Sequence, residues 1–203
     1  MAYTQLDDGS NVLRVPAHTQ PDTENECMVY CVYMLIEYCR TVYPVDLVRD
    51  TTPALDPKEI KEFIKIRPMG WAVDENDIEA LSAAVSPIEF ELQEYERSPS
   101  AQKLFNILGN QLDRHLPTIA VVDAIQIQEA RTNRNISSNG GQTEHAVVVV
   151  GLNDRNVYLN DPWGGMQVPV DWHTFSEAWD VGLNRLITMD LQSTLEDHTE
   201  DSA

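Results

Sequence analysis

The sequence predicts an α+β fold, in which a helical N-terminal half packs on an antiparallel sheet formed by the C-terminal half. In the first half, apolar residues recur every three or four positions in segments that follow helix-capping residues, as in amphipathic helices. In the second half, short runs of Val, Ile and Leu are bounded by Gly, Asn, Asp and Pro, as in strands joined by turns. No repeat or linker divides the chain, so we expect one domain over residues 1–192 and an acidic, disordered tail over 193–203.

The most apolar helix is expected to begin near Cys27, directly after the polar, cap-rich segment 19–26. Its apolar residues lie on a broad face, which places the helix centrally in the fold. Three further helices follow from caps and apolar stripes, at residues 58–66, 75–85 and 98–115, and Trp172, Phe175 and Trp179 mark a short fourth one.

The strands of the second half are expected at residues 118–122, 146–151, 157–160 and 186–191, and an earlier strand at 88–92 follows Pro87. Residues 153–156, with the sequence Asn-Asp-Arg-Asn, are suited to a hairpin turn. Residues 127–144 are polar, and we predict a long loop there that ends at His145 and acts as a lid.

The chain of 203 residues carries 33 acidic and 14 basic side chains, for a net charge of −19. No basic stripe is available for phosphates, so binding to nucleic acid is not expected. An acidic, lysine-poor surface is typical of proteins adapted to high salt, and an ordinary acidic cytosolic protein is the alternative. No apolar stretch is long enough to span a bilayer, so we expect a cytoplasmic protein without membrane insertion.

All three cysteines, Cys27, Cys31 and Cys39, lie on the central helix. An odd number in this arrangement suits no disulfide framework, so at least one is expected to be a free thiol. Unpaired amides and the helix dipole favour a thiolate at Cys27, whereas the other two are deeper in the helix and are expected to pack as small hydrophobes. A structural role for Cys27 stays open. A metal site that combines Cys27 and Cys31 with a histidine is a weaker alternative, because no second ligand pair is present.

Three polar residues have the positions that a thiol nucleophile needs. His145 begins one strand and Asp161 ends the next, so the hairpin at 153–156 brings the two side by side at one edge of the sheet. Gln20 lies seven positions before Cys27, where its side-chain amide could join the backbone amide of Cys27 in binding an oxyanion. Taken singly, each residue has a commoner explanation as a solvated or turn residue, so the prediction depends on their combination.

These residues resemble the bacteriocin-processing peptidases that cleave double-glycine leaders, and their stand-alone relatives, a branch of the papain-like cysteine peptidases. The resemblance lies in Val15-Pro16, Gln20, Glu26-Cys27 and the helix after it, residues 144–151 (EHAVVVVG), residues 157–165 (VYLNDPWGG) and the closing helix at 175–179. It implies a papain-like fold and a Cys-His-Asp triad formed by Cys27, His145 and Asp161, with Gln20 at the oxyanion hole. No cofactor and no metal are implied.

The chain departs from this family where Met28 and Val29 replace the Gly, and often Pro, that usually follow the nucleophile. Met28 places a bulky side chain beside the site and could narrow the substrate groove. The transporter segments fused to many leader-cleaving members are also lacking, so a leader peptide is not the expected substrate. The sequence therefore predicts a cysteine peptidase that cleaves a peptide or protein through a thioester. The alternatives are an inactive, peptidase-like binding module and an acyltransferase that uses the same nucleophile; the oligomeric state stays unassigned.

Overall fold

One antiparallel sheet organises the described residues, which in this computed structural model are 2–21, 26–43, 52–64, 73–132, 144–182 and 184–191. Within them eight strands pair in the order β1-β2-β5-β4-β8-β3, and β6 pairs with both β5 and β7. The strands are β1 (Tyr3–Gln5), β2 (Asn11–Leu13), β3 (Ile88–Glu94), β4 (Thr118–Asp123), β5 (Glu144–Leu152), β6 (Asn156–Asp161), β7 (Gly165–Asp171) and β8 (Arg185–Leu191). The expected α+β class is confirmed.

The centre of the sheet is formed by β4 and β5, whose residues are almost all buried. Because neither face of these strands meets water, both read as continuous apolar runs without alternation. The hairpin expected at residues 153–156 joins β5 to β6: the Asn153 side-chain oxygen accepts the N–H groups of Arg155 and Asn156 at 2.8 and 2.7 Å. Such self-capping by Asn stabilises a tight turn and fixes the register of β6 against β5.

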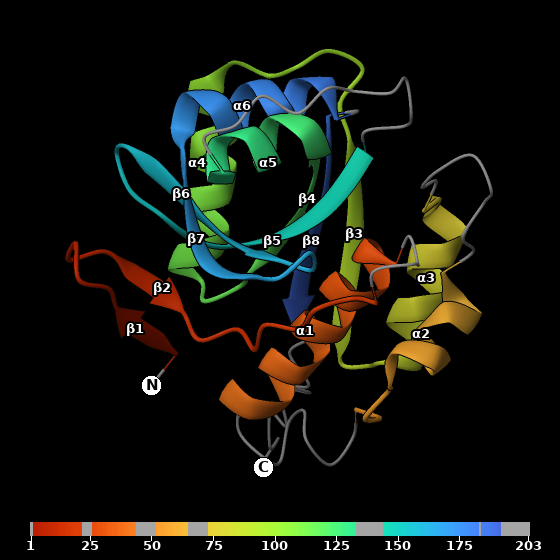
Figure 1. Ribbon diagram of the computed structural model, residues 1–203. Helices are drawn as coiled ribbons and strands as arrows, with labels where there is room; N and C mark the ends of the chain where they lie inside the picture. The colour runs from red at the N-terminus through yellow and green to blue at the C-terminus, as the bar shows by residue number, and fades with distance from the viewer. Residues whose placement is uncertain are drawn as a thin grey trace, which may run out of the picture.

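Six helices lie among the described residues; five of them gather at two ends of the sheet, and the sixth (Ala101–Asp113) runs along β5 (Figure 1). At one end, α1 lies along β5 and contacts α2, while α3 covers β3; at the other, α5 and α6 lie side by side over β4 and β7. The helices are α1 (Cys27–Val42), α2 (Pro57–Phe63), α3 (Glu75–Ala84), α4 (Ala101–Asp113), α5 (Ala124–Thr132) and α6 (Trp172–Val181).

Local sequence explains where these helices begin. The carboxylates of Asp56 and Asp74 accept backbone N–H groups in the first turns of α2 and α3, and Ser100 caps α4 in the same way. α1 differs, because it begins at Cys27 without a side-chain cap. Its first turn is therefore anchored by packing, and its buried face contains ten residues that include Cys27, Cys31 and Cys39.

The prediction of one loop over residues 127–144 is wrong in its first part, where α5 continues to Thr132. This helix begins directly at the end of β4, and the Asp123 carboxylate accepts the Gln126 N–H at 2.8 Å. Only Ala124 and Ile127 of α5 are buried, so its apolar pattern is too weak to be recognised. Residues 133–143, the rest of the predicted lid, lie outside the described residues.

Three strands were not predicted. β1 and β2 have three residues each and pair with one another, which is too short for an apolar period to be read. β7 is mostly half-exposed and contains Pro169, and its Gln167 has a φ of 52°. Residues 65–66 and the tail at 193–203 lie outside the described residues, so these two expectations are not tested. Among the described residues, no helix combines the length and the apolar character needed to cross a membrane.

Candidate active site

Three chain segments converge at the start of β5. Cys27 is the first residue of α1, His145 is the second residue of β5, and Asp161 is the last residue of β6. The antiparallel pairing of β5 and β6 returns the end of β6 to the start of β5, as the hairpin predicts. The backbone N–H of Ala146 donates to the Cys27 sulfur at 3.4 Å. The predicted nucleophile, base and carboxylate therefore share one corner of the fold.

One ring nitrogen of His145 is bound to Asp161, and the other is not. Its Nε2 lies 2.7 Å from Oδ1 of Asp161, which assigns the proton to Nε2 in the neutral ring. Its Nδ1 is buried and is not bound by Asp161, and the ring also interacts with the Cys27 side chain. Because Asp161 occupies Nε2, Nδ1 is the nitrogen that can exchange a proton with the Cys27 thiol.

The electrostatics of the pair favour an imidazolium. Burial by itself would lower the pKa of His145, but the hydrogen bond to Asp161 and the interaction with Cys27 outweigh burial and raise that pKa to about 9. Burial acts on Asp161 in the opposite sense and would raise its pKa, yet His145, the Trp163 amide and Arg131 together hold it below its ordinary value. Asp161 is therefore an anion at neutral pH, and it supports a positive charge on His145.

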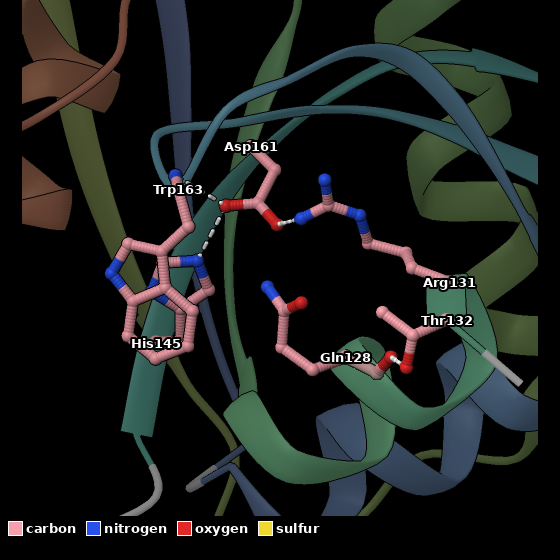
Figure 2. Close-up of polar contacts among 6 residues, drawn as sticks. All are labelled: Gln128, Arg131, Thr132, His145, Asp161 and Trp163. Atoms are coloured by element: carbon pink, nitrogen blue, oxygen red, sulfur yellow. Dashed lines mark hydrogen bonds and ion pairs between the residues drawn. The ribbon is translucent and has the colours of Figure 1, made fainter. Parts of the chain in front are cut away.

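Two residues that the sequence did not assign to the site complete the surroundings of Asp161 (Figure 2). The backbone N–H of Trp163 donates to Oδ1 at 2.8 Å, and Arg131 on α5 forms an ion pair with Oδ2. The Trp163 indole stacks on the His145 ring with centroids 4.1 Å apart and planes 26° apart. Trp163 is 45 % exposed whereas His145 is 1 % exposed, so the indole separates the imidazole from solvent.

Gln20 lies beside the turn that follows Asp161. It is buried, and its backbone N–H donates to the carbonyl of Pro162 at 2.8 Å. The segment before it is fixed by the buried Asn160, whose side chain donates to the Val15 carbonyl at 2.9 Å and accepts the Gln167 N–H at 2.9 Å. The N-terminal arm is thus attached to the β6–β7 hairpin, and Gln20 is brought to the corner that holds His145 and Asp161.

Comparison with known proteins identifies the family of the chain. The model of the Peptidase_C39-like family matches residues 12–182, which is most of the chain. The chain belongs to that family. A search of the curated proteins found no match.

Solved structures of C39 peptidases have the same fold at low sequence identity. A C39-like peptidase from Bacillus anthracis is 16 % identical, with a TM-score of 0.58, and the match covers 87 % of this chain and 94 % of that one. The peptidase domain of Streptococcus ComA, a bifunctional ABC transporter of a quorum-sensing pathway, is 16 % identical with a TM-score of 0.55, covering 88 % and 100 %. A double-glycine-motif protease from an AMS/PCAT transporter, solved with a leader peptide, is 17 % identical with a TM-score of 0.51, covering 86 % and 91 %.

The residue after the predicted nucleophile, where this C39-like chain departs from the resemblance, does not face solvent. Met28 is 2 % exposed, and its side chain lines a void of about 10 Å³ together with Val73, Leu92, Val121, Arg185 and Ile187. Such a void is too small to accept a substrate side chain. Met28 is therefore a core residue of this C39-like domain, packed between α1 and the sheet, and its bulk is directed into the interior.

The other two cysteines of the C39-like domain are packed as expected. Cys31 and Cys39 are fully buried, and burial raises the pKa of both thiols well above the ordinary value. Both are neutral hydrophobes at physiological pH. Among the described residues, no three ligating side chains come together to hold a metal ion.

Proposed function

We propose that this C39-like protein is a thiol hydrolase that cleaves a peptide or related amide bond with Cys27 as nucleophile. The observation that carries the proposal is the position of His145, which binds Asp161 through Nε2 and also interacts with the Cys27 side chain. A histidine held in this way can take a proton from a thiol and later give it to a leaving amine. Membership of the Peptidase_C39-like family supports the same chemistry.

In the proposed reaction, the Cys27 sulfur attacks the acyl carbon while His145 carries the thiol proton. The oxyanion that forms would be bound by the backbone N–H of Cys27 and the side-chain amide of Gln20. The N–H of a first helical residue has no partner within its helix and so is available for this role. His145 then protonates the departing amine, and water releases the acyl group from sulfur.

Selective alkylation of the intact protein tests the proposal without a known substrate. The exposed fractions of Cys27, Cys31 and Cys39 are 3, 0 and 0 %, so burial barely distinguishes the three thiols, and a faster reaction at Cys27 would report its activation. With iodoacetamide at pH 7.5 and peptide mapping by mass spectrometry, we expect the alkylation rate of Cys27 to exceed the rates of the other two cysteines by at least about tenfold. His145→Ala should slow Cys27 without affecting Cys31 or Cys39. Equal, slow labelling of all three would contradict the proposal.

The depth of the site favours a second candidate, a peptidase-like module that binds peptide without turnover. Cys27 and His145 are 3 % and 1 % exposed. The described residues therefore leave almost no surface of either side chain open to a substrate. Activated labelling of Cys27 together with failure to cleave any peptide in a random library would favour this module. Transfer of the acyl group to an added amine, in place of water, would identify an acyltransferase.

A further inference from the structure

Arg131 completes the set of hydrogen bonds around Asp161. The Asp161 side chain is fully buried, and its Oδ1 accepts from His145 Nε2 at 2.7 Å and from the Trp163 N–H at 2.8 Å. Its Oδ2 is bound by the Arg131 guanidinium, whose side chain is 16 % exposed. Figure 2 shows that His145 and Arg131 approach the carboxylate from opposite sides. Both oxygens are therefore fixed, and rotation of the carboxylate would break contacts at either end.

The fold keeps room for this guanidinium at Gly165. A Cβ at Gly165 would lie 2.9 Å from Nη2 of Arg131 and 2.6 Å from Cγ2 of Val168. The turn of α5 that carries Arg131 is also braced, because the Thr132 hydroxyl donates to the Gln128 carbonyl at 2.7 Å. Two elements far apart in sequence, the end of α5 and the start of β7, thus both accommodate the contact between Arg131 and Asp161.

We propose that Arg131 is a positioning residue of the active site, which fixes Asp161 through Oδ2 and offsets its charge. This inference rests on the proposed function. Four ionisable groups interact in sequence here, namely Arg131, Asp161, His145 and Cys27. When His145 is an imidazolium and Cys27 a thiolate, the charges of the four groups sum to zero. Without Arg131 the sum becomes negative, which would hold the proton on His145 more tightly and make it a poorer acid toward a leaving amine.

The groups that act on the two central residues come from several elements. His145 on β5 interacts with Cys27 on α1 and Asp161 on β6, and Asp161 interacts with His145 and with Arg131 on α5. Cys31 on α1 is also affected by the charge of Asp161, but its thiol stays neutral because it is buried. Arg131 is therefore the cation whose removal should change the protonation of His145 through Asp161.

Paired alkylating reagents measure this effect in the whole protein. Iodoacetate is an anion and reacts faster beside an imidazolium, whereas iodoacetamide is neutral, so their rate ratio at Cys27 reports the charge of His145. In the parent we expect this ratio to fall as pH rises through about 9, where His145 loses its proton. The midpoint is the pH at which half of this fall in the rate ratio has occurred. In Arg131→Gln, which keeps a hydrogen-bond donor but removes the charge, the midpoint should move upward by about one pH unit.

Three further variants separate positioning from general stability. Arg131→Lys keeps the charge, so its midpoint should stay near that of the parent. Arg114→Gln removes the same charge from an exposed ion pair with Asp190 and should leave the midpoint unchanged. Gly165→Ala displaces the guanidinium without removing it, and its midpoint should move upward by less than that of Arg131→Gln. This variant also gives a result if Arg131→Gln does not fold.

The outcomes distinguish this inference from the function on which it rests. An unchanged midpoint in Arg131→Gln or Gly165→Ala, with Cys27 still the fastest thiol, would overturn the role of Arg131 and leave the proposed hydrolase standing. A lower melting temperature without a shift of the midpoint would assign Arg131 a purely structural role, which also overturns the inference. Equal labelling of the three cysteines in the parent would overturn both.

Discussion

Replacing Asp161 by Asn should remove most of the positive charge from His145 at neutral pH. The substitution keeps the shape of the side chain but removes the anion that accepts from Nε2 at 2.7 Å. Burial lowers the pKa of His145, and the hydrogen bond to Asp161 is the largest single contribution that opposes burial; together with Cys27, Asp161 raises this pKa to about 9. Without the anion, the pKa should fall toward its ordinary value of about 6.5, because burial still lowers it and only the interaction with Cys27 still raises it. At pH 7.5 the imidazolium then changes from nearly all of the population to a minor fraction.

The assay is alkylation of Cys27 by iodoacetate, followed from pH 5.5 to 10. We expect the rate at pH 7.5 to fall by about tenfold or more. The pH at which the rate declines as His145 loses its proton, which we call the alkaline limb, should move from about 9 to below about 7. Loss of one partner from a buried pair should also lower the free energy of unfolding by about 3–5 kcal/mol. Asp190→Asn, which breaks the exposed pair with Arg114, should cost at most about 1 kcal/mol and leave the rate unchanged. An alkaline limb that stays near 9 in Asp161→Asn would refute the reasoning.

Two further predictions concern stability. The pKa of His145 is raised in the folded state to about 9, so its proton stabilises the fold fully below about pH 6.5, and this contribution of up to about 3 kcal/mol is lost as pH rises through about 9. The difference in unfolding free energy between the parent and His145→Gln should therefore narrow over that interval, and a constant difference would contradict the raised pKa. Gly182→Ala would place a Cβ 2.5 Å from the Val122 Cα, whereas Gly109→Ala meets nothing within 4 Å; urea unfolding should show a loss of about 1–3 kcal/mol for the first and a gain of up to about 1 kcal/mol for the second, and equal effects would contradict the close contact.

The sequence predicted the parts of the fold that depend on strong local signals. The helix from Cys27 is marked by its broad apolar face, the hairpin at 153–156 by its turn residue Asn153, and the almost fully buried strands β4 and β5 by continuous apolar runs. The hairpin was decisive for the site, because it brings His145 and Asp161, which lie apart in the sequence, into contact. Order along the chain was therefore enough to bring these two side chains together.

The elements that were missed lack such signals. α5 buries only two side chains, and half-exposed β7 contains a proline and a residue with positive φ. Both elements depend on tertiary contacts, since α5 rests on α6 and β7 completes the sheet beside β6. Such elements are set by what surrounds them, which a local apolar period cannot report.

The same limit explains why Arg131 could not be assigned from the sequence. An arginine in a polar segment is typical of solvated surface, and its role depends on a helix that was not predicted and on a glycine 34 positions further on. Met28 illustrates the converse, because its place next to Cys27 suggested a narrowed groove, whereas helix geometry directs it into the core. Neighbours in sequence on a helix point about 100° apart, so Met28 does not share the surroundings of Cys27. The side chain that acts on Cys27 is His145 on β5, and Arg131 on α5 acts on His145 through Asp161.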